Sequence, residues 1–159
     1  MGVRDTLSRL LAGDATTASR EATAALVLSY IDCVKRTAQL ERHADMAPQQ
    51  CSMQALKNLA SADAQLCERL RDAVEAAGAP VPPVAPEPPP RGALNHWARL
   101  IHDLEAHRLA VQQFRELGLR LAPGFAQTVA LFESLCRAEA IHCEDLRGLI
   151  ARADPQALN

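Results

Sequence analysis

The stretch APVPPVAPEPPPRG, residues 79–92, separates two helix-rich halves of the chain and decides how those halves can pack. It holds seven of the ten prolines in a chain of 159 residues. Such a segment prefers the extended polyproline II conformation, which rises about 3.1 Å per residue and here reaches on the order of 40 Å. A helix of about 27 residues is equally long, because it rises about 1.5 Å per residue. The stretch can therefore run the full length of a helical bundle.

Four long segments with apolar residues at helical spacing flank this stretch, two on each side. They predict helices over residues 14–47, 51–78, 93–121 and 124–153. Pro48, Gly78 and Pro123 mark the ends of the first three, because proline and glycine interrupt helices. A further short amphipathic helix is predicted over residues 3–11, ending before Gly13.

The short connections within each half indicate two antiparallel helix hairpins. Joined by the long crossover, the hairpins predict an all-α four-helix bundle that forms a single domain over residues 1–159. The alternative is two separate hairpins on a flexible linker. Each hairpin alone would leave a wide apolar face exposed to water, which favours the single bundle.

The composition is that of an ordinary globular protein, with 48% hydrophobic, 23% charged and only 3% aromatic residues. A net charge of −2 and scattered basic residues predict no nucleic-acid partner. No apolar run approaches the roughly 18–20 residues of a membrane span, and the N-terminus lacks the apolar core of a secretory signal. Five cysteines, an odd number without a C-x-x-C pair, favour reduced thiols and a cytoplasmic location.

Two polar residues interrupt the apolar stripe of the last predicted helix. Glu139 and His142 continue the alternating three- and four-residue spacing that starts at Phe125, so both project from the buried face. Burying them is unfavourable unless a metal ion, a buried cation or a hydrogen-bond network satisfies them. Asp63 occupies the matching position of the second helix, where Leu66 stands in place of the histidine.

With Glu-Ala-Ile-His at residues 139–142, the chain resembles the ferritin-like superfamily, in particular rubrerythrin-type four-helix bundles. In that family each hairpin gives a glutamate from its first helix and a Glu-x-x-His from its second, and the set holds two iron or manganese ions. The resemblance implies a degenerate di-metal site made of Asp63, Glu105, Glu139 and His142. Tyr30 stands near the position of the remaining family glutamate.

A metal-free core is the alternative for these side chains. The Arg108 guanidinium would pair with Asp63 or Glu139 in place of the lost cation, and Tyr30 would hydrogen-bond to a remaining carboxylate oxygen. The polar network would then consist of Tyr30, Asp63, Arg108, Glu139 and His142. Two further groups are predicted at the surface: Asp103 with His107, four residues apart on one helix, and the stretch around His43. The alternative for His107, at the edge of the core, is a position facing Phe114.

Three functions follow from these patterns. We expect a ferritin-like bundle that lacks a complete di-iron centre and acts as a structural or binding protein, as a homodimer formed through Ala- and Leu-rich helix faces. The alternative is an oxidoreductase or metal-storage protein that binds a divalent transition metal, iron or manganese, at the reduced carboxylate and histidine site. The third is a helix-interaction module whose proline-rich crossover recruits a protein partner.

Overall fold

Four α-helices dominate the computed structural model, which describes residues 3–85, 94–122 and 124–153 and has no β-strand within them. Their bounds are α1 Val3–Asp45, α2 Gln50–Ala76, α3 His96–Leu121 and α4 Ala126–Ile150. The predicted all-α class is therefore confirmed. Within the same ranges, no helix combines the length and the apolar character that crossing a membrane would require.

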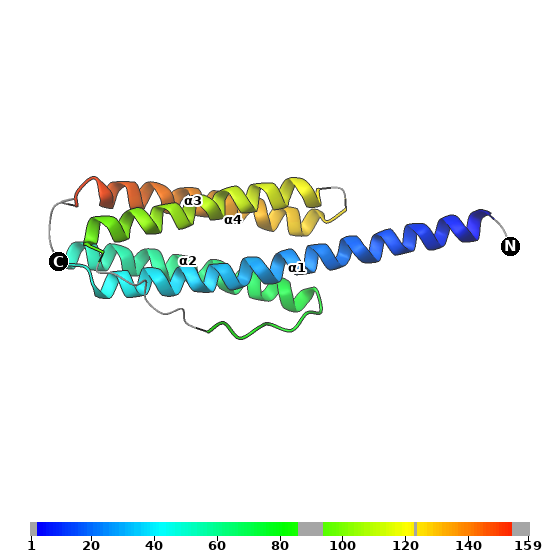
Figure 1. Cartoon of the computed structure of the whole chain (residues 1–159), viewed down its shortest axis with the longest axis horizontal. Helices are drawn as coiled ribbons and strands as arrows, with labels where there is room; N and C mark the ends of the chain where they lie inside the picture. The colour runs from blue at the N-terminus through cyan, green and yellow to red at the C-terminus, as the bar shows by residue number, and fades with distance from the viewer. Residues whose placement is uncertain (1–2, 86–93, 123, 154–159) are drawn as a thin grey trace.

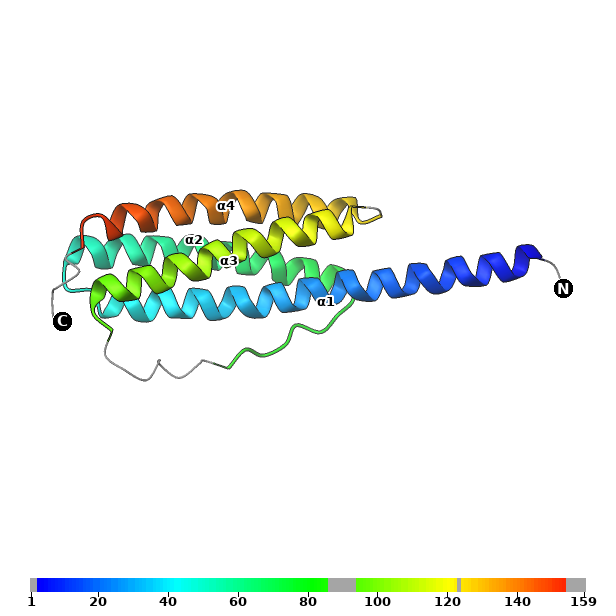
Figure 2. The same ribbon diagram turned by 45° about the horizontal axis from the view of Figure 1, so that its top comes forward.

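Consecutive helices form two antiparallel hairpins, α1 with α2 and α3 with α4 (Figure 1). The two hairpins meet where α1 packs on α3 and α2 packs on α4. The end of α2 and the start of α3 lie at opposite ends of the bundle, so these helices run in the same direction, as predicted (Figure 2). Residues 79–85 turn back along the bundle from the end of α2, and residues 86–92 of the crossover lie outside the described residues.

Gly78 stops α2 at the place that the sequence predicts. Its φ of +74° lies in the left-handed region, which glycine adopts without a steric penalty. The Gly78 N–H donates to the Glu75 carbonyl at 2.9 Å, and the Ala79 N–H donates to the Val74 carbonyl at 3.2 Å. These two bonds form a Schellman motif, and Pro80 directly after it cannot continue a helix.

The prediction of a separate short helix over residues 3–11 is wrong, because α1 is continuous from Val3 to Asp45. Gly13 does not break it, since a single glycine weakens a helix by only about 1 kcal/mol relative to alanine. The N-terminal part of α1 extends beyond the ends of the other helices (Figure 1). The bounds of α2, α3 and α4 each lie within three residues of the predicted ones.

Two hydrophobic clusters fill the bundle, one on each side of a buried polar layer. The first includes Phe114 and Phe132, whose stacked rings have centroids 5.8 Å apart. The second includes Leu100 and Leu146. Every helix places buried polar residues between the two clusters, and we call this set the polar belt: Arg36 and Thr37, Asp63, His107, Glu139 and His142.

Candidate metal centre

The polar belt gathers charged and imidazole side chains from all four helices. They are Arg36 on α1, Asp63 on α2, His107 on α3, and Glu139 and His142 on α4. Each lies on the inward stripe of its helix, so the packing of the apolar neighbours one turn before and after it sets its direction. All five are buried, and Asp63, His107 and Glu139 have no exposed surface at all.

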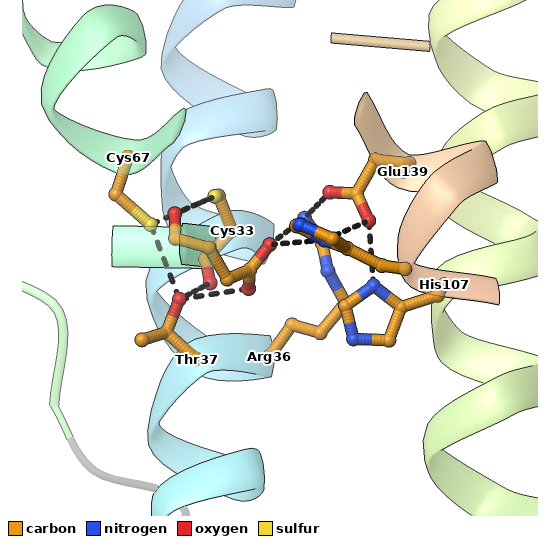
Figure 3. Close-up of polar contacts among 8 residues, drawn as sticks. Cys33, Arg36, Thr37, Cys67, His107 and Glu139 are labelled. Atoms are coloured by element: carbon orange, nitrogen blue, oxygen red, sulfur yellow. Dashed lines mark hydrogen bonds and ion pairs between the residues drawn. The ribbon is translucent and has the colours of Figure 1, made fainter. Parts of the chain in front are cut away.

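Arg36 lies between the two carboxylates. Its Nη2 contacts Glu139 Oε1 in a close ion pair and lies 3.4 Å from Asp63 Oδ1 (Figure 3). Burial alone would lower the pKa of the guanidinium, but the negative charges of Glu139 and Asp63 raise that pKa above its ordinary value. Arg36 is therefore a permanent positive charge at the centre of the belt.

Glu139 on α4 accepts a hydrogen bond from His107 on α3, the other helix of the same hairpin. His107 Nδ1 lies 2.5 Å from Glu139 Oε2, and because the carboxylate can only accept, Nδ1 carries the proton. The other ring nitrogen of His107, Nε2, is buried and has no hydrogen-bond partner among the described residues. In the neutral tautomer with the proton on Nδ1, the Nε2 lone pair would be available to a ligand.

His142 faces both carboxylates without bonding to either. Its Nδ1 lies 3.5 Å from Glu139 Oε2 and 3.8 Å from Asp63 Oδ1. Within the described ranges this buried nitrogen has no hydrogen-bond partner. The His142 ring meets the His107 ring edge to face, with centroids 5.5 Å apart. A buried imidazole nitrogen between two carboxylate oxygens is an unusual and unfavourable arrangement unless a proton or a metal ion lies between them.

Thr37 holds the second oxygen of Asp63. Its hydroxyl has a single proton to donate and lies 2.8 Å from Asp63 Oδ2, 3.0 Å from the Cys33 carbonyl oxygen and 3.3 Å from Cys67 Sγ. Because Oδ2 is engaged by α1, Asp63 presents Oδ1 to Arg36 and His142. The belt therefore has a fixed carboxylate on each side of the Arg36 guanidinium.

The two carboxyl groups have opposite pKa shifts. Burial raises the pKa of Asp63, and the attraction of Arg36 offsets this only in part. Burial would also raise the pKa of Glu139, but the hydrogen bond from His107, the nearby His142 ring and the charge of Arg36 hold it well below its usual range. As the pH falls, Asp63 therefore takes up a proton first, and Glu139 stays ionised to a lower pH.

Four residues of the belt can offer a metal ligand atom each. One oxygen or nitrogen of Asp63, His107, Glu139 and His142 lies within 4.8 Å of those of the other three. Two carboxylates and two imidazoles are the donors that iron, manganese and zinc accept in proteins. The unpartnered Nδ1 of His142 and Nε2 of His107 also fit metal binding, because a neutral imidazole binds a metal through such a lone pair.

The structure brings three of the predicted metal residues together and separates the fourth. Asp63, Glu139 and His142 lie in the belt, whereas Glu105 is exposed on the outer face of α3. Arg108 is also exposed, so its predicted pairing with the carboxylates is wrong. Tyr30 is half-buried and packs against the hydrophobic cluster of Phe114 and Phe132, rather than among the polar belt residues.

Arg36 and His107 occupy positions for which the sequence predicts Arg108 and Glu105. Arg36 supplies the guanidinium that was expected from Arg108, and His107 supplies the α3 donor expected from Glu105. A signal for His107 exists in the sequence, because Leu100, Asp103, His107, Ala110 and Phe114 follow three- and four-residue spacing. The predicted stripe of this helix instead includes Leu104 and Val111, which places His107 at the edge of the core.

Asp103 and His43 form a second buried pair, so their predicted surface positions are wrong. His43 Nδ1 lies 2.8 Å from Asp103 Oδ2, and Gln39 Nε2 donates to Asp103 Oδ1 at 2.6 Å. The side chains of His43 and Asp103 are almost fully buried between α1 and α3. This pair links the two hairpins one turn beyond His107, toward the start of α3.

Two antiparallel hairpins, the parallel direction of α2 and α3, and a polar centre supplied by all four helices define a ferritin-like four-helix bundle. Among solved structures the chain is similar to Dps from Thermosynechococcus elongatus, with a TM-score of 0.75. That similarity covers 90% of this chain and 98% of that one at 15% sequence identity, so it supports the fold alone. No protein-family model matches the chain, and no curated protein matches it in sequence.

Proposed function

We propose that this protein binds one divalent transition-metal ion, iron or manganese, through Asp63, His107, Glu139 and His142. The observation that carries the proposal is the buried Nδ1 of His142, which has no hydrogen-bond partner within the described ranges and faces two carboxylate oxygens. Ligand atoms about 2.1 Å from one ion are separated by about 3.0–4.2 Å. The distances of 3.5 and 3.8 Å from His142 Nδ1 to the carboxylates fall within that span.

The charge of Arg36 favours one ion over two. The charges of Asp63, Glu139 and Arg36 alone sum to one net negative charge. One divalent ion would reverse that charge, while two would leave three buried positive charges without counter-ions, at a prohibitive desolvation energy. A complete di-iron centre therefore does not fit this belt, and Arg36 stands in for the second cation.

A surface depression between α2 and α4 supports access to the site. Its wall includes His142 together with Asn58 and Asp145, and apolar side chains such as Leu59 and Leu149 complete it. His142 is the belt residue that lines this depression, and 6% of its surface is exposed.

At such a site, some residues of the polar belt would bind the ion and others would hold those ligands in position. Asp63 Oδ1, Glu139 Oε2 and His142 Nδ1 would be ligands, and Thr37 and Arg36 would hold the two carboxylates in position. His107 would act as the fourth ligand or would orient Glu139 through its Nδ1 proton. Iron or manganese would supply redox or storage capacity when bound.

A metal-free core is the second candidate, and the contacts of Arg36 with both carboxylates favour it. With one imidazole protonated, the four charged groups would balance without any ion. The protein would then be a structural or binding bundle.

For either function we propose a homodimer of single-domain chains. Exposed Leu109 and Leu119 on α3, at 58% and 74% exposure, support a helix face that packs against another copy.

Elemental analysis separates the two functions. Protein expressed with added iron or manganese should retain about one metal ion per chain, and His142→Ala should lose it. His102→Ala is the matched control, because His102 is an exposed histidine on α3. Metal content near zero in the wild-type protein, or equal content in both variants, would instead support the metal-free core.

A further inference from the structure

Cys33 and Cys67 face each other within the α1–α2 hairpin. Their Sγ atoms lie 2.7 Å apart, and both thiols are free (Figure 3). Cys33 has no exposed surface and Cys67 has 7%. The two residues are 34 positions apart in the sequence, so the hairpin alone brings the sulfurs together. Metal binding at the belt uses neither of them.

Hydrogen bonds hold this thiol pair in place beside Asp63. The Cys33 Sγ lies 3.7 Å from the Asp63 carbonyl, and the Thr37 hydroxyl contacts Cys67 Sγ at 3.3 Å. An S–S bond is about 2.05 Å long, so a side-chain shift of well under 1 Å would bring the sulfurs to bonding distance. The hairpin therefore already holds the two sulfurs close to the separation that a disulfide requires.

The other three cysteines lack such a partner. Cys51 is exposed at the start of α2, Cys136 donates to the Val111 carbonyl at 3.5 Å, and Cys143 is buried on α4. Within the described residues, Cys33 and Cys67 are the only two thiols in contact with each other. This contrast separates the pair from cysteines that merely fill space in a helical core.

We propose that Cys33 and Cys67 form a redox-active dithiol that hydrogen peroxide converts into an intramolecular disulfide between α1 and α2. Cys67 reacts first because it is the more exposed of the two residues. The proposal requires no bound metal, so it stands apart from the metal site proposed above.

The reaction balances with peroxide as the only oxidant. The Cys67 thiolate attacks one peroxide oxygen, the O–O bond breaks, and hydroxide leaves, which yields a sulfenic acid on Cys67. The Cys33 sulfur then attacks the Cys67 sulfur, the S–S bond forms, the S–O bond breaks, and the oxygen leaves as water with the Cys33 proton. Two thiols lose two electrons and two protons in total, and one peroxide becomes two waters.

Peptide mapping of the full-length wild-type protein tests this inference directly. Folded protein would be treated with hydrogen peroxide in the presence of a chelator, alkylated, and digested with trypsin without reduction. The expected product is a disulfide-linked pair of peptides, residues 21–35 joined to residues 58–69, each of which contains one cysteine. Free thiols should fall from five to three, the chain should lose the mass of two hydrogens, and dithiothreitol should restore both.

Single variants provide the controls. Cys51→Ala should still form the linked peptides, because Cys51 is exposed and remote from the pair. Cys33→Ala should form none, and its Cys67 should gain oxygen mass instead. Linked peptides that join other cysteines, covalent dimers in place of an internal bond, or five thiols surviving in folded wild-type protein would each overturn the proposal. The peptide map of the wild-type protein tests the proposal even if one of the variants fails to fold.

Discussion

Arg36 and Glu139 are 103 residues apart in the sequence, yet they form a close ion pair in the middle of the bundle. Since α1 packs on α2 and α3, and α4 packs on the same two helices, α1 and α4 lie diagonally across the bundle. The ion pair therefore crosses the core from one hairpin to the other. Both side chains are buried, so water cannot replace either partner.

Replacing Arg36 with methionine should destabilise the protein strongly. The change leaves Asp63 and Glu139 buried without their shared cation, and removing one partner of a buried ion pair typically costs about 3–5 kcal/mol. Urea unfolding followed by circular dichroism would measure the loss as a lower free energy of unfolding.

The matched control is Arg108→Met on the exposed face of α3. Its free energy of unfolding should stay within about 0.5 kcal/mol of the wild type, as for most surface substitutions. Equal losses in the two variants would contradict the position of Arg36 as the cation of the core.

Glu139 should contribute stability that disappears in acid. Its pKa in the folded protein lies below the ordinary value of 4.5, so the folded state favours the ionised form. This contribution is fully present above pH 4.5 and is lost as the pH falls through the lowered pKa. Glu139→Gln should therefore be less stable than wild type at neutral pH and approach it in acid, as measured by urea unfolding at a series of pH values.

Asp63 should show the opposite sign. Its pKa in the folded protein lies above the ordinary value of 3.8, so the folded state binds the proton more tightly than the unfolded state. The wild type therefore loses this contribution as the pH rises through the raised pKa. The free energy of unfolding of Asp63→Asn minus that of the wild type should therefore be more positive at neutral pH than near pH 3.8. A change of the opposite sign between the two pH values would contradict the assignment.

The sequence predicts those parts of the site that interrupt a clear apolar stripe. Asp63, Glu139 and His142 each occupy a position where a buried apolar residue is expected, and the structure buries all three. The crossover and the stop at Gly78 are equally predictable, because proline and glycine restrict the backbone locally. These features depend on neighbours within one helical turn.

Arg36 and His107 depend on packing that no single helix contains. Arg36 is adjacent to Thr37, and the spacing alone allows either residue to face the core; long arginine side chains usually reach solvent. His107 lies one turn after Asp103 on the same inward face of α3, and Asp103 contacts His43 on α1. Glu105 is predicted from the ferritin-like resemblance, whereas Arg108 is predicted from a helix register set by Leu104, which is only half-buried.

Thr37 should stabilise Asp63 through one buried hydrogen bond. Thr37→Val keeps the shape of the side chain but removes the donor to Asp63 Oδ2, which leaves a buried acceptor unsatisfied at a cost of about 1–3 kcal/mol. Thr23→Val is the control, because the Thr23 hydroxyl donates to the Ser19 carbonyl in an exposed hydrogen bond within α1. Thermal unfolding should separate the two variants, and equal midpoints would argue against the Thr37 bond.

Metal binding should be visible as added stability. A ligand that binds only the folded state at a free concentration of 100 times its Kd stabilises by about 2.7 kcal/mol. Manganese chloride, titrated into protein first stripped with a chelator, should therefore raise the thermal unfolding midpoint of the wild type. The same titration should leave His142→Ala unchanged, since that variant lacks the nitrogen that faces both carboxylates.

Glu105→Gln is the carboxylate control for this titration, because Glu105 lies on the surface of α3 and outside the polar belt. It should respond to manganese as the wild type does. A midpoint that rises equally in His142→Ala would place the ion elsewhere on the protein. If magnesium chloride at the same concentration raised the wild-type midpoint as much as manganese did, the shift would reflect general charge screening, because a site with imidazole ligands discriminates against magnesium.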